Sequence, residues 1–166
     1  AENISIESKN IILDKDSMNS VFEDDVVIKT DTDQIIKSDY AEYDKLKNKV
    51  ILKKNISEIN KQNNIIESEY AEYYEKLRVF KSIGKTKVIT AKQYIVESSD
   101  VVLNNKKKII QSSKKTIITD QDNNKIFLEN FEYDSEKNIF KSVGLIKIED
   151  YKKNSYNFSQ IYIDTK

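Results

Sequence analysis

The sequence predicts an all-β protein in which about eleven antiparallel strands form a V-shaped slot built from thirty-residue repeats. Three observations carry this prediction. The octet SDYAEYDK, which begins at Ser38, returns as SEYAEYYE at Ser68. Later copies, such as YIVESSDVVLN, are rich in β-branched and aromatic residues with a period near two, which is typical of strands. The only glycines, Gly84 and Gly144, occupy the same place in two repeats, inside a predicted strand, where glycine marks a bend.

The first strand of each repeat carries apolar residues at even positions and then at odd positions. The columns begin at Ile6, Ile11 and Leu13, and their members recur every thirty residues without a slip of register. A bulge or bend near the ninth or tenth residue of the repeat accounts for the change of parity. A polar column at that point is expected to face outward: Lys9, Asp39, Glu69, Ser99 and Glu129. Read alone, the two octets could open amphipathic helices, but copies that share a fold must all be strands.

The second strand of each repeat has apolar or small residues at even positions, with Gly84 and Gly144 near its middle. Turn-forming residues separate the strands, because Asp and Asn side chains accept hydrogen bonds from the backbone of a turn. One turn column contains Asp14, Asp44, Asn104, Asp134 and Asp164. Neighbouring strands in such a meander pair antiparallel, and a bend in each strand folds the sheet into two walls.

An open-ended meander of this kind presents a continuous apolar trough with unpaired edge strands at both ends. The side chains expected to line the trough are Ile6, Ile11, Leu13, Val26, Ile36, Ala41, Tyr43, Val50, Ile56, Ile66, Ala71, Tyr73, Phe80, Val96, Val101, Leu103, Ile110, Ile126, Phe131, Tyr133, Phe140 and Ile146. The hydroxyl of a tyrosine favours a boundary between apolar and wet surface, so the tyrosines of this set indicate a lipid.

Composition argues against several classes of protein. The formal net charge is zero, so no nucleic-acid partner is expected. The chain has no His and no Cys, which leaves the serine column without a general base and argues against a metal centre. Neither DTDQ nor DQDNN completes a calcium loop, and no glycine-rich phosphate loop is present. We therefore expect no catalysis, no metal and no cofactor.

The repeat resembles the OstA-like β-jellyroll family of lipopolysaccharide transport proteins. The pattern I-x-S-[DE]-x-A-x-Y-[DE] in both octets carries this likeness, as do KNKVILKKNISEI and LRVFKSIGKTKVIT. The run from YIVESSDVVLN to KIFLENFEYD is most similar to the N-terminal periplasmic domain of the outer-membrane lipopolysaccharide-assembly protein LptD, and an LptA-like bridge protein comes second. Where the family often has Gly-Asn at the bend, this chain has Asp24-Asp25, Lys54-Asn55 and Lys114-Lys115.

The resemblance implies one OstA-like domain over residues 1–166, made of five and a half repeats. Its trough would bind the lipid A acyl chains of lipopolysaccharide and pass them across the periplasm of a Gram-negative bacterium. Its partners would be an upstream LptA-like bridge protein, joined by edge-strand pairing, and an outer-membrane barrel with its lipoprotein plug on the C-terminal side. The chain begins AENISIES and ends IYIDTK, as expected of a processed segment that precedes a barrel.

One alternative stays open on the sequence alone. The apolar columns could form an ordinary closed core, and the chain would then be a β-repeat scaffold or adhesin-type segment without a lipid ligand. The two readings differ in whether the walls close on each other or stay apart.

Overall fold

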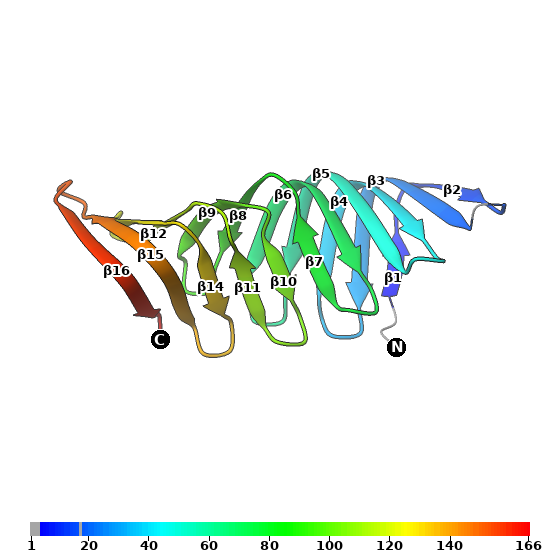
Figure 1. Ribbon diagram of the computed structural model, residues 1–166. Coiled ribbons are helices and arrows are strands. Elements are labelled where there is room, and N and C mark those ends of the chain that lie inside the picture. The colour runs from blue at the N-terminus through cyan, green and yellow to red at the C-terminus, as the bar shows by residue number, and fades with distance from the viewer. Residues whose placement is uncertain (1–3, 17) are drawn as a thin grey trace.

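The computed structural model describes residues 4–16 and 18–166, and it confirms the all-β prediction. Sixteen antiparallel strands form one sheet, and the described residues contain no helix. Accordingly, this part of the chain has no helix that is long and apolar enough to cross a membrane. The chain runs from one end of an elongated molecule to the other, so strands β1 and β16 lie far apart (Figure 1).

The strands follow the thirty-residue register of the sequence. Their bounds are β1 (Ile4–Glu7), β2 (Asn10–Asp14), β3 (Asn19–Thr30), β4 (Ile35–Asp44), β5 (Lys49–Ile59), β6 (Ile65–Tyr74), β7 (Val79–Ser82), β8 (Lys85–Ile89), β9 (Ile95–Ser99), β10 (Val102–Asn104), β11 (Ile109–Ser112), β12 (Thr116–Thr119), β13 (Lys125–Leu128), β14 (Phe131–Asp134), β15 (Ile139–Glu149) and β16 (Ser155–Asp164). The two octets lie in β4 and β6, so both are strands and not helices.

There are sixteen strands rather than about eleven because five of the expected strands are interrupted at their bends. The interrupted pairs are β1/β2, β7/β8, β9/β10, β11/β12 and β13/β14. The other six strands continue through the bend, and β3, β4, β5 and β15 shift register there, as between Lys37 and Tyr40 on β4. This shift is the bulge that the change of parity predicts.

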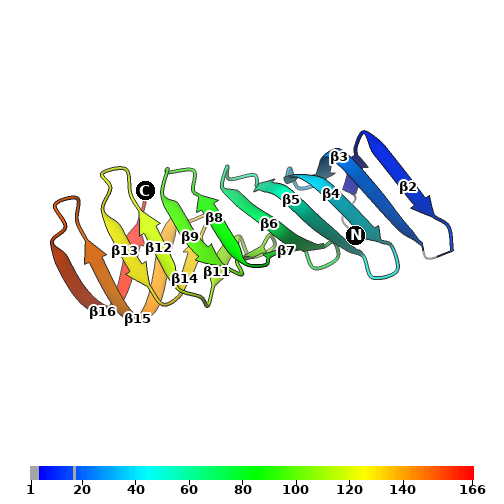
Figure 2. The same cartoon turned by 90° about the horizontal axis from the view of Figure 1, so that it is seen from above.

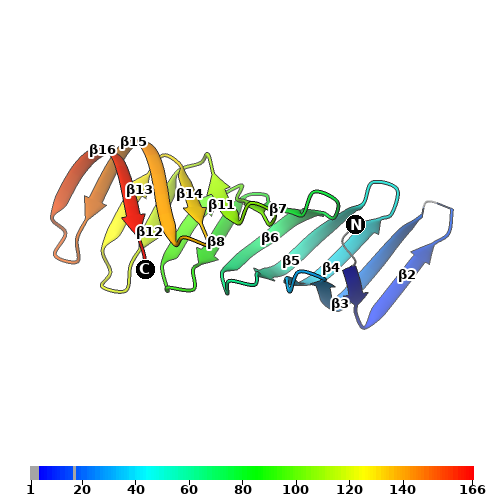
Figure 3. The ribbon, with the colours of Figure 1, turned by 90° about the horizontal axis from the view of Figure 1, so that it is seen from below.

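The bends divide the sheet into two walls that share a crease. We call wall I the part containing β1, β8, β9, β12 and β13, and wall II the part containing β2, β7, β10, β11 and β14. The long strands contribute one half to each wall. Between β6 and β15 the walls are hydrogen-bonded separately, because β6 pairs with both β7 and β8, and β15 pairs with both β14 and β13. Figure 2 views the crease from above, and Figure 3 views the opposite side from below.

The crease forms even at bends that have no glycine. Positive φ angles between 50° and 65° occur at Asp24, Asp25, Lys54 and Asn55. The two glycines at the bends also have positive φ angles, 81° at Gly84 and 106° at Gly144. Asp and Asn tolerate this left-handed region, whereas lysine enters it at a cost of about 1–2 kcal/mol. At the Lys114-Lys115 bend neither lysine has a positive φ. Asp100, between β9 and β10, has a φ of 51°, and its backbone nitrogen donates to the Gly84 carbonyl.

The turns use the residues expected from the sequence. The Oδ1 atom of Asp44 accepts a hydrogen bond from the backbone nitrogen of Lys47, and Asn104 and Asp134 cap their own turns in the same way. These turns form the free edge of wall II, which we call lip II. The turns at 31–34, 60–64, 90–94, 120–124 and 150–154 form the free edge of wall I, which we call lip I.

Candidate functional site: the apolar trough

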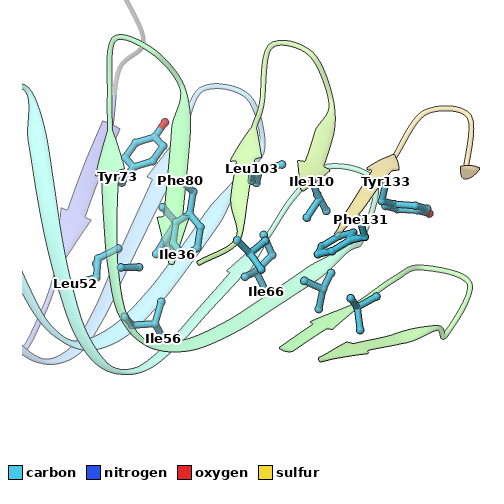
Figure 4. Close-up of a cluster of buried hydrophobic side chains, with 14 of the residues drawn as sticks. Ile36, Leu52, Ile56, Ile66, Tyr73, Phe80, Leu103, Ile110, Phe131 and Tyr133 are labelled. Atoms are coloured by element: carbon cyan, nitrogen blue, oxygen red, sulfur yellow. The ribbon is translucent and has the colours of Figure 1, made fainter. Parts of the chain in front are cut away.

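The candidate site is the space between the two walls, filled by side chains from both. Seventeen of the twenty-two side chains predicted to line the trough are buried, including Tyr73, Phe80 and Leu103, and Figure 4 shows these residues with their neighbours. Ile6, Tyr43 and Ile126 are partly buried and pack against this cluster. Ile11 and Leu13 are exposed because β2 pairs only with β3.

The expected sidedness of the first strand also agrees with the structure. Ile36, Ile66 and Val96 are fully buried. The polar column at the bend is not: Lys9, Glu69 and Glu129 are exposed, and Asp39 and Ser99 are intermediate.

The middle of the trough is closed, because the two lips meet there. The Nδ2 atom of Asn105 on lip II donates to Thr32 Oγ1 at 3.3 Å and lies 3.5 Å from Gln34 Oε1, both on lip I. Further along, the ring of Tyr94 on lip I lies 5.8 Å from the ring of Phe140 on wall II, measured between centroids. The contacts of Asn105 with Thr32 and Gln34 had no direct signal in the sequence, since they join residues about seventy positions apart.

A single carboxyl group lies in the closed middle. Glu58 occupies the column of Ile28, Val88 and Ile118, is 0% exposed, and pairs across the sheet with Ile36 and Ile66. Neither of its carboxyl oxygens has a hydrogen-bond partner among the described residues, and the side-chain nitrogens of Gln34 and Asn64 are also unpaired. Burial raises the pKa of Glu58 to about 8, while the nearby Gln34 amide opposes that shift.

At both ends the same apolar columns reach solvent. Leu13 at the N-terminal end is 66% exposed. At the C-terminal end Phe158 is 48% exposed, although its cross-strand partner Ile146 is buried in the core. The trough is therefore continuous in composition, closed in the middle and open at its ends.

Hydroxyl groups line the bottom of the trough along the crease. Ser38 and Ser68 each donate to the carbonyl two residues ahead, and Ser82, Ser112 and Ser142 accept from or donate to the backbone of the neighbouring strand. The backbone leaves its regular ladder at the bend, and these hydroxyls replace hydrogen bonds lost there. The sequence showed these positions as small inward residues, without their role in the bend.

The outer face has a hollow of its own. It has a volume of about 760 Å³, and most of its lining residues face outward on wall I, among them Glu97, Ile117 and Phe127, with Leu145 beside the crease. The buried core residues Leu128 and Ile146 also contribute to its lining. No group of three or more acidic residues that could hold a metal ion occurs among the residues placed by the structure.

No family model matches the sequence, and no curated protein sequence matches it. Among solved structures, the chain is similar to LptH, the LptA-homologous periplasmic component of the lipopolysaccharide transport device of Pseudomonas aeruginosa. The alignment covers 96% of both chains with 12% identity and a TM-score of 0.50. The TCP10 domain of Danio rerio CPAP, solved with a STIL peptide, aligns with 7% identity and a TM-score of only 0.18, too low to indicate a shared fold. This chain has the antiparallel β-jellyroll fold seen in LptH.

Proposed function

We propose that this protein carries lipopolysaccharide, with the lipid A acyl chains in the apolar trough, across the periplasm toward an outer-membrane translocon. The observation that carries the proposal is an apolar interior that reaches solvent at both ends of the sheet, at Leu13 and Phe158. The fold of LptH and the family resemblance of the repeats support the same function. In this role the chain acts by binding and not by catalysis.

The physical reason for a trough is the cost of exposing acyl chains to water. Each methylene removed from water contributes about 0.8 kcal/mol, so a chain of a dozen carbons would cost on the order of 10 kcal/mol to expose. A column of similar apolar side chains every thirty residues lets a chain slide with little change in free energy from one repeat to the next. Direction must then come from an energy source outside this protein.

The open ends and edge strands support end-to-end assembly. Among the described strands, β1 and β2 pair only with β3, and β16 pairs only with β15. Such edges can be extended by a strand from another chain. We propose an LptA-like bridge protein at the β1/β2 end, and an outer-membrane barrel with its lipoprotein plug at the β16 end.

Within this proposal residues 1–166 form one OstA-like periplasmic domain. We place it as the N-terminal domain of an LptD-like barrel protein, since the run from YIVESSDVVLN to KIFLENFEYD resembles that domain. An LptA-like bridge protein is the second candidate.

The closed middle favours a different function, that of a scaffold or adhesin-type segment. Ile66, Tyr73 and Leu103 are fully buried, as in an ordinary core. A lipid that passes the whole length must therefore separate lip I from lip II where Asn105 meets Gln34. The two functions differ in whether a lipid reaches the middle.

Photocrosslinking tests the proposal directly. Benzoylphenylalanine would replace Phe158, which faces the trough, or Tyr162, which lies on the same strand with its ring against Lys141 on the outer face. We expect irradiation to attach lipopolysaccharide at position 158 at least about tenfold more than at 162, because both sites are exposed and they lie on opposite faces of β16. Equal labelling, or none at 158, would contradict lipid binding in the trough.

A second pair tests passage through the middle. Tyr73 is fully buried and faces the trough, whereas Tyr70 faces outward on the same strand, paired with Lys53. Labelling at position 73 but not at 70 would show that the lips separate. The scaffold function predicts labelling at neither position.

A further inference from the structure

The charges on the two lips differ, although the chain as a whole is neutral. The four-residue turns of lip II at 45–48, 75–78, 105–108 and 135–138 contain eight cations and two acidic residues. The five turns of lip I contain four lysines and five aspartates. Lip II therefore carries a net positive charge and lip I a slight net negative charge along the opening of the trough.

The cations are densest in the middle of lip II. The turns at 75–78 and 105–108 are neighbours, because β7 pairs with β10 and the backbone nitrogen of Asn105 donates to the Arg78 carbonyl at 2.9 Å. Between them they carry Lys76, Arg78, Lys106, Lys107 and Lys108, which we call the cationic lip. The strands before these turns end in Tyr74 and Asn104, so the aspartate found at the equivalent place in other repeats is absent here.

These five cations have no partner of opposite charge within the described chain. The ion pairs there join other lysines, Lys9, Lys49, Lys114 and Lys147, to acidic residues elsewhere on the sheet. Glu75, on the first of these turns, accepts a hydrogen bond from the Tyr43 hydroxyl at 3.0 Å, and Asp31 and Asp33 lie on the turn of lip I that Asn105 contacts. Several unpaired positive charges on adjacent turns attract an anion more strongly than scattered ones do.

The cationic lip also borders the apolar interior directly. Tyr73, Phe80 and Leu103, which are fully buried, lie on the strands that end in its two turns. The hydroxyls of Tyr43 and Tyr133 reach lip II, at Glu75 and Asn138 respectively, which places the boundary between apolar and polar surface at this lip. A ligand with acyl chains inside the walls would hold its head group at the height of these turns.

We propose that the cationic lip binds the phosphate groups of the acylated ligand, so that the head group lies along lip II and not along lip I. This inference rests on the proposed lipid-carrier function and specifies which of the two lips the head group lies along. Lysine and arginine are the side chains that bind phosphate oxygens most strongly, through charge-assisted hydrogen bonds. Such binding also fixes the direction in which the head group faces as the lipid moves.

A comparison of two lipids with the same acyl chains separates the contribution of the head group to binding from that of the chains. We would measure binding of didecanoyl phosphatidic acid and of didecanoylglycerol to the wild-type protein, using intrinsic tyrosine fluorescence. We expect the phosphate-bearing lipid to bind about tenfold more tightly, and raising the salt concentration from low to high to remove most of that preference.

A matched pair of triple variants locates the effect. Lys106→Gln/Lys107→Gln/Lys108→Gln removes three charges from the cationic lip, and Lys92→Gln/Lys152→Gln/Lys153→Gln removes three from lip I. Each triple contains one residue at positive φ, Lys108 at 59° and Lys153 at 65°, so the backbone cost of substitution is similar. We expect the first triple to reduce the preference to within about twofold without changing didecanoylglycerol binding, and the second to leave the preference intact. Thermal midpoints check that both variants fold.

The outcomes separate the two proposals. If neither lipid binds the wild-type protein, the carrier function falls and this inference falls with it. If both lipids bind equally, or if the lip I triple loses the preference instead, the carrier function stands and the cationic lip is not a head-group site. Inorganic pyrophosphate that bound the protein as tightly as phosphatidic acid would show a free-phosphate site and would also overturn the inference.

Discussion

Leu13 and Leu103 are both leucines and occupy the same column of the repeat, ninety positions apart. Leu13 is nevertheless 66% exposed, whereas Leu103 is fully buried. Leu103 lies on β10 between β7 and β11. Leu13 lies on β2, which has a neighbour on one side only. The comparison shows that position in the repeat determines which face a side chain takes, while neighbouring strands determine whether it is buried.

The middle and the ends therefore have different requirements. The middle is complete within the chain, with buried columns on both walls and polar contacts across the lips. The ends expose apolar side chains on unpaired strands, so a neighbouring strand would both extend the sheet and bury these residues. For lipid passage the requirements are the opposite. The ends already expose apolar side chains to a lipid, whereas the middle must open before a lipid can enter it.

The largest expected effect comes from placing the same charge at the two leucines. Leu103→Asp should lower the free energy of unfolding by more than about 4 kcal/mol, because it leaves a cavity and an unpaired carboxylate in the closed middle. Leu13→Asp should change it by less than about 1 kcal/mol, because the site is already in water. Urea unfolding of the two variants measures both. Similar losses would mean that the two positions do not differ in burial as described.

The fold could be predicted from sequence because the repeat decided between helix and strand where a single segment could not. The octets at Ser38 and Ser68 could be helices by local propensity, but they share a register with YIVESSDVVLN, which could only be strand. The inward faces followed from the same register, as Ile66 and Val96 illustrate. Interruptions of strands depend on hydrogen bonding at each bend, which the apolar pattern does not encode.

The closure of the site could not be predicted in the same way. Side-chain columns give the face of a strand, but the angle between walls depends on contacts such as that of Asn105 with Gln34. Glu58 carried a signal that could have been used, since it is the one carboxylate in a column of Ile28, Val88, Ile118 and Ile148. Lip charges were visible only once the structure assigned each turn to a wall.

Glu58 makes stability depend on pH if the middle stays closed. Its pKa is raised from an ordinary value near 4.5 to about 8 by burial. The folded state then holds a proton that the unfolded state has lost, so stability should fall as pH rises from about 4.5 to about 8, by several kcal/mol at about 1.4 kcal/mol per pH unit. Urea unfolding at a series of pH values measures this decline.

Two variants assign the pH effect to this residue. Glu58→Gln should flatten the profile and make the protein more stable than wild type above pH 8. Glu67→Gln, on the outward face of the adjoining strand, should leave the decline unchanged. A flat wild-type profile would show that water reaches Glu58, and hence that the middle is open in solution.

A cross-link between the lips should hold the middle closed while the ends stay open. The chain has no cysteine, so Gln34→Cys/Asn105→Cys introduces one pair across the lips. The cysteine sulfur atoms lie closer to the backbone than the amide groups they replace, so a short bifunctional thiol reagent is used to join them. We expect this cross-link to stabilise the fold by about 2–4 kcal/mol, because the loop it closes is long. Photolabelling by lipopolysaccharide should then disappear at position 73 and persist at 158.

The single-cysteine variants are the controls for that experiment, since neither can form the bond. Failure of the double variant to cross-link would mean that the two lips lie further apart than the reagent can reach. Cross-linking without loss of labelling at position 73 would mean that lipid reaches the middle from an end, without separating the lips.

The smallest expected effect concerns the crease beneath the closed middle. Lys54 holds a φ of 65° at the position that Gly84 and Gly144 occupy in other repeats. Lys54→Gly removes a left-handed strain of about 1–2 kcal/mol but adds freedom to the unfolded chain, for a net gain of about 0.5–1 kcal/mol. Gly84→Lys is the reverse exchange, and since a Cβ at Gly84 would meet no atom within 4 Å, only backbone strain should lower its stability, by a similar amount. Thermal unfolding of the two variants should therefore give shifts of opposite sign. If both variants lose stability, then the Lys54 side chain contributes contacts that outweigh its backbone strain, and the crease is maintained by more than the conformation of a single residue.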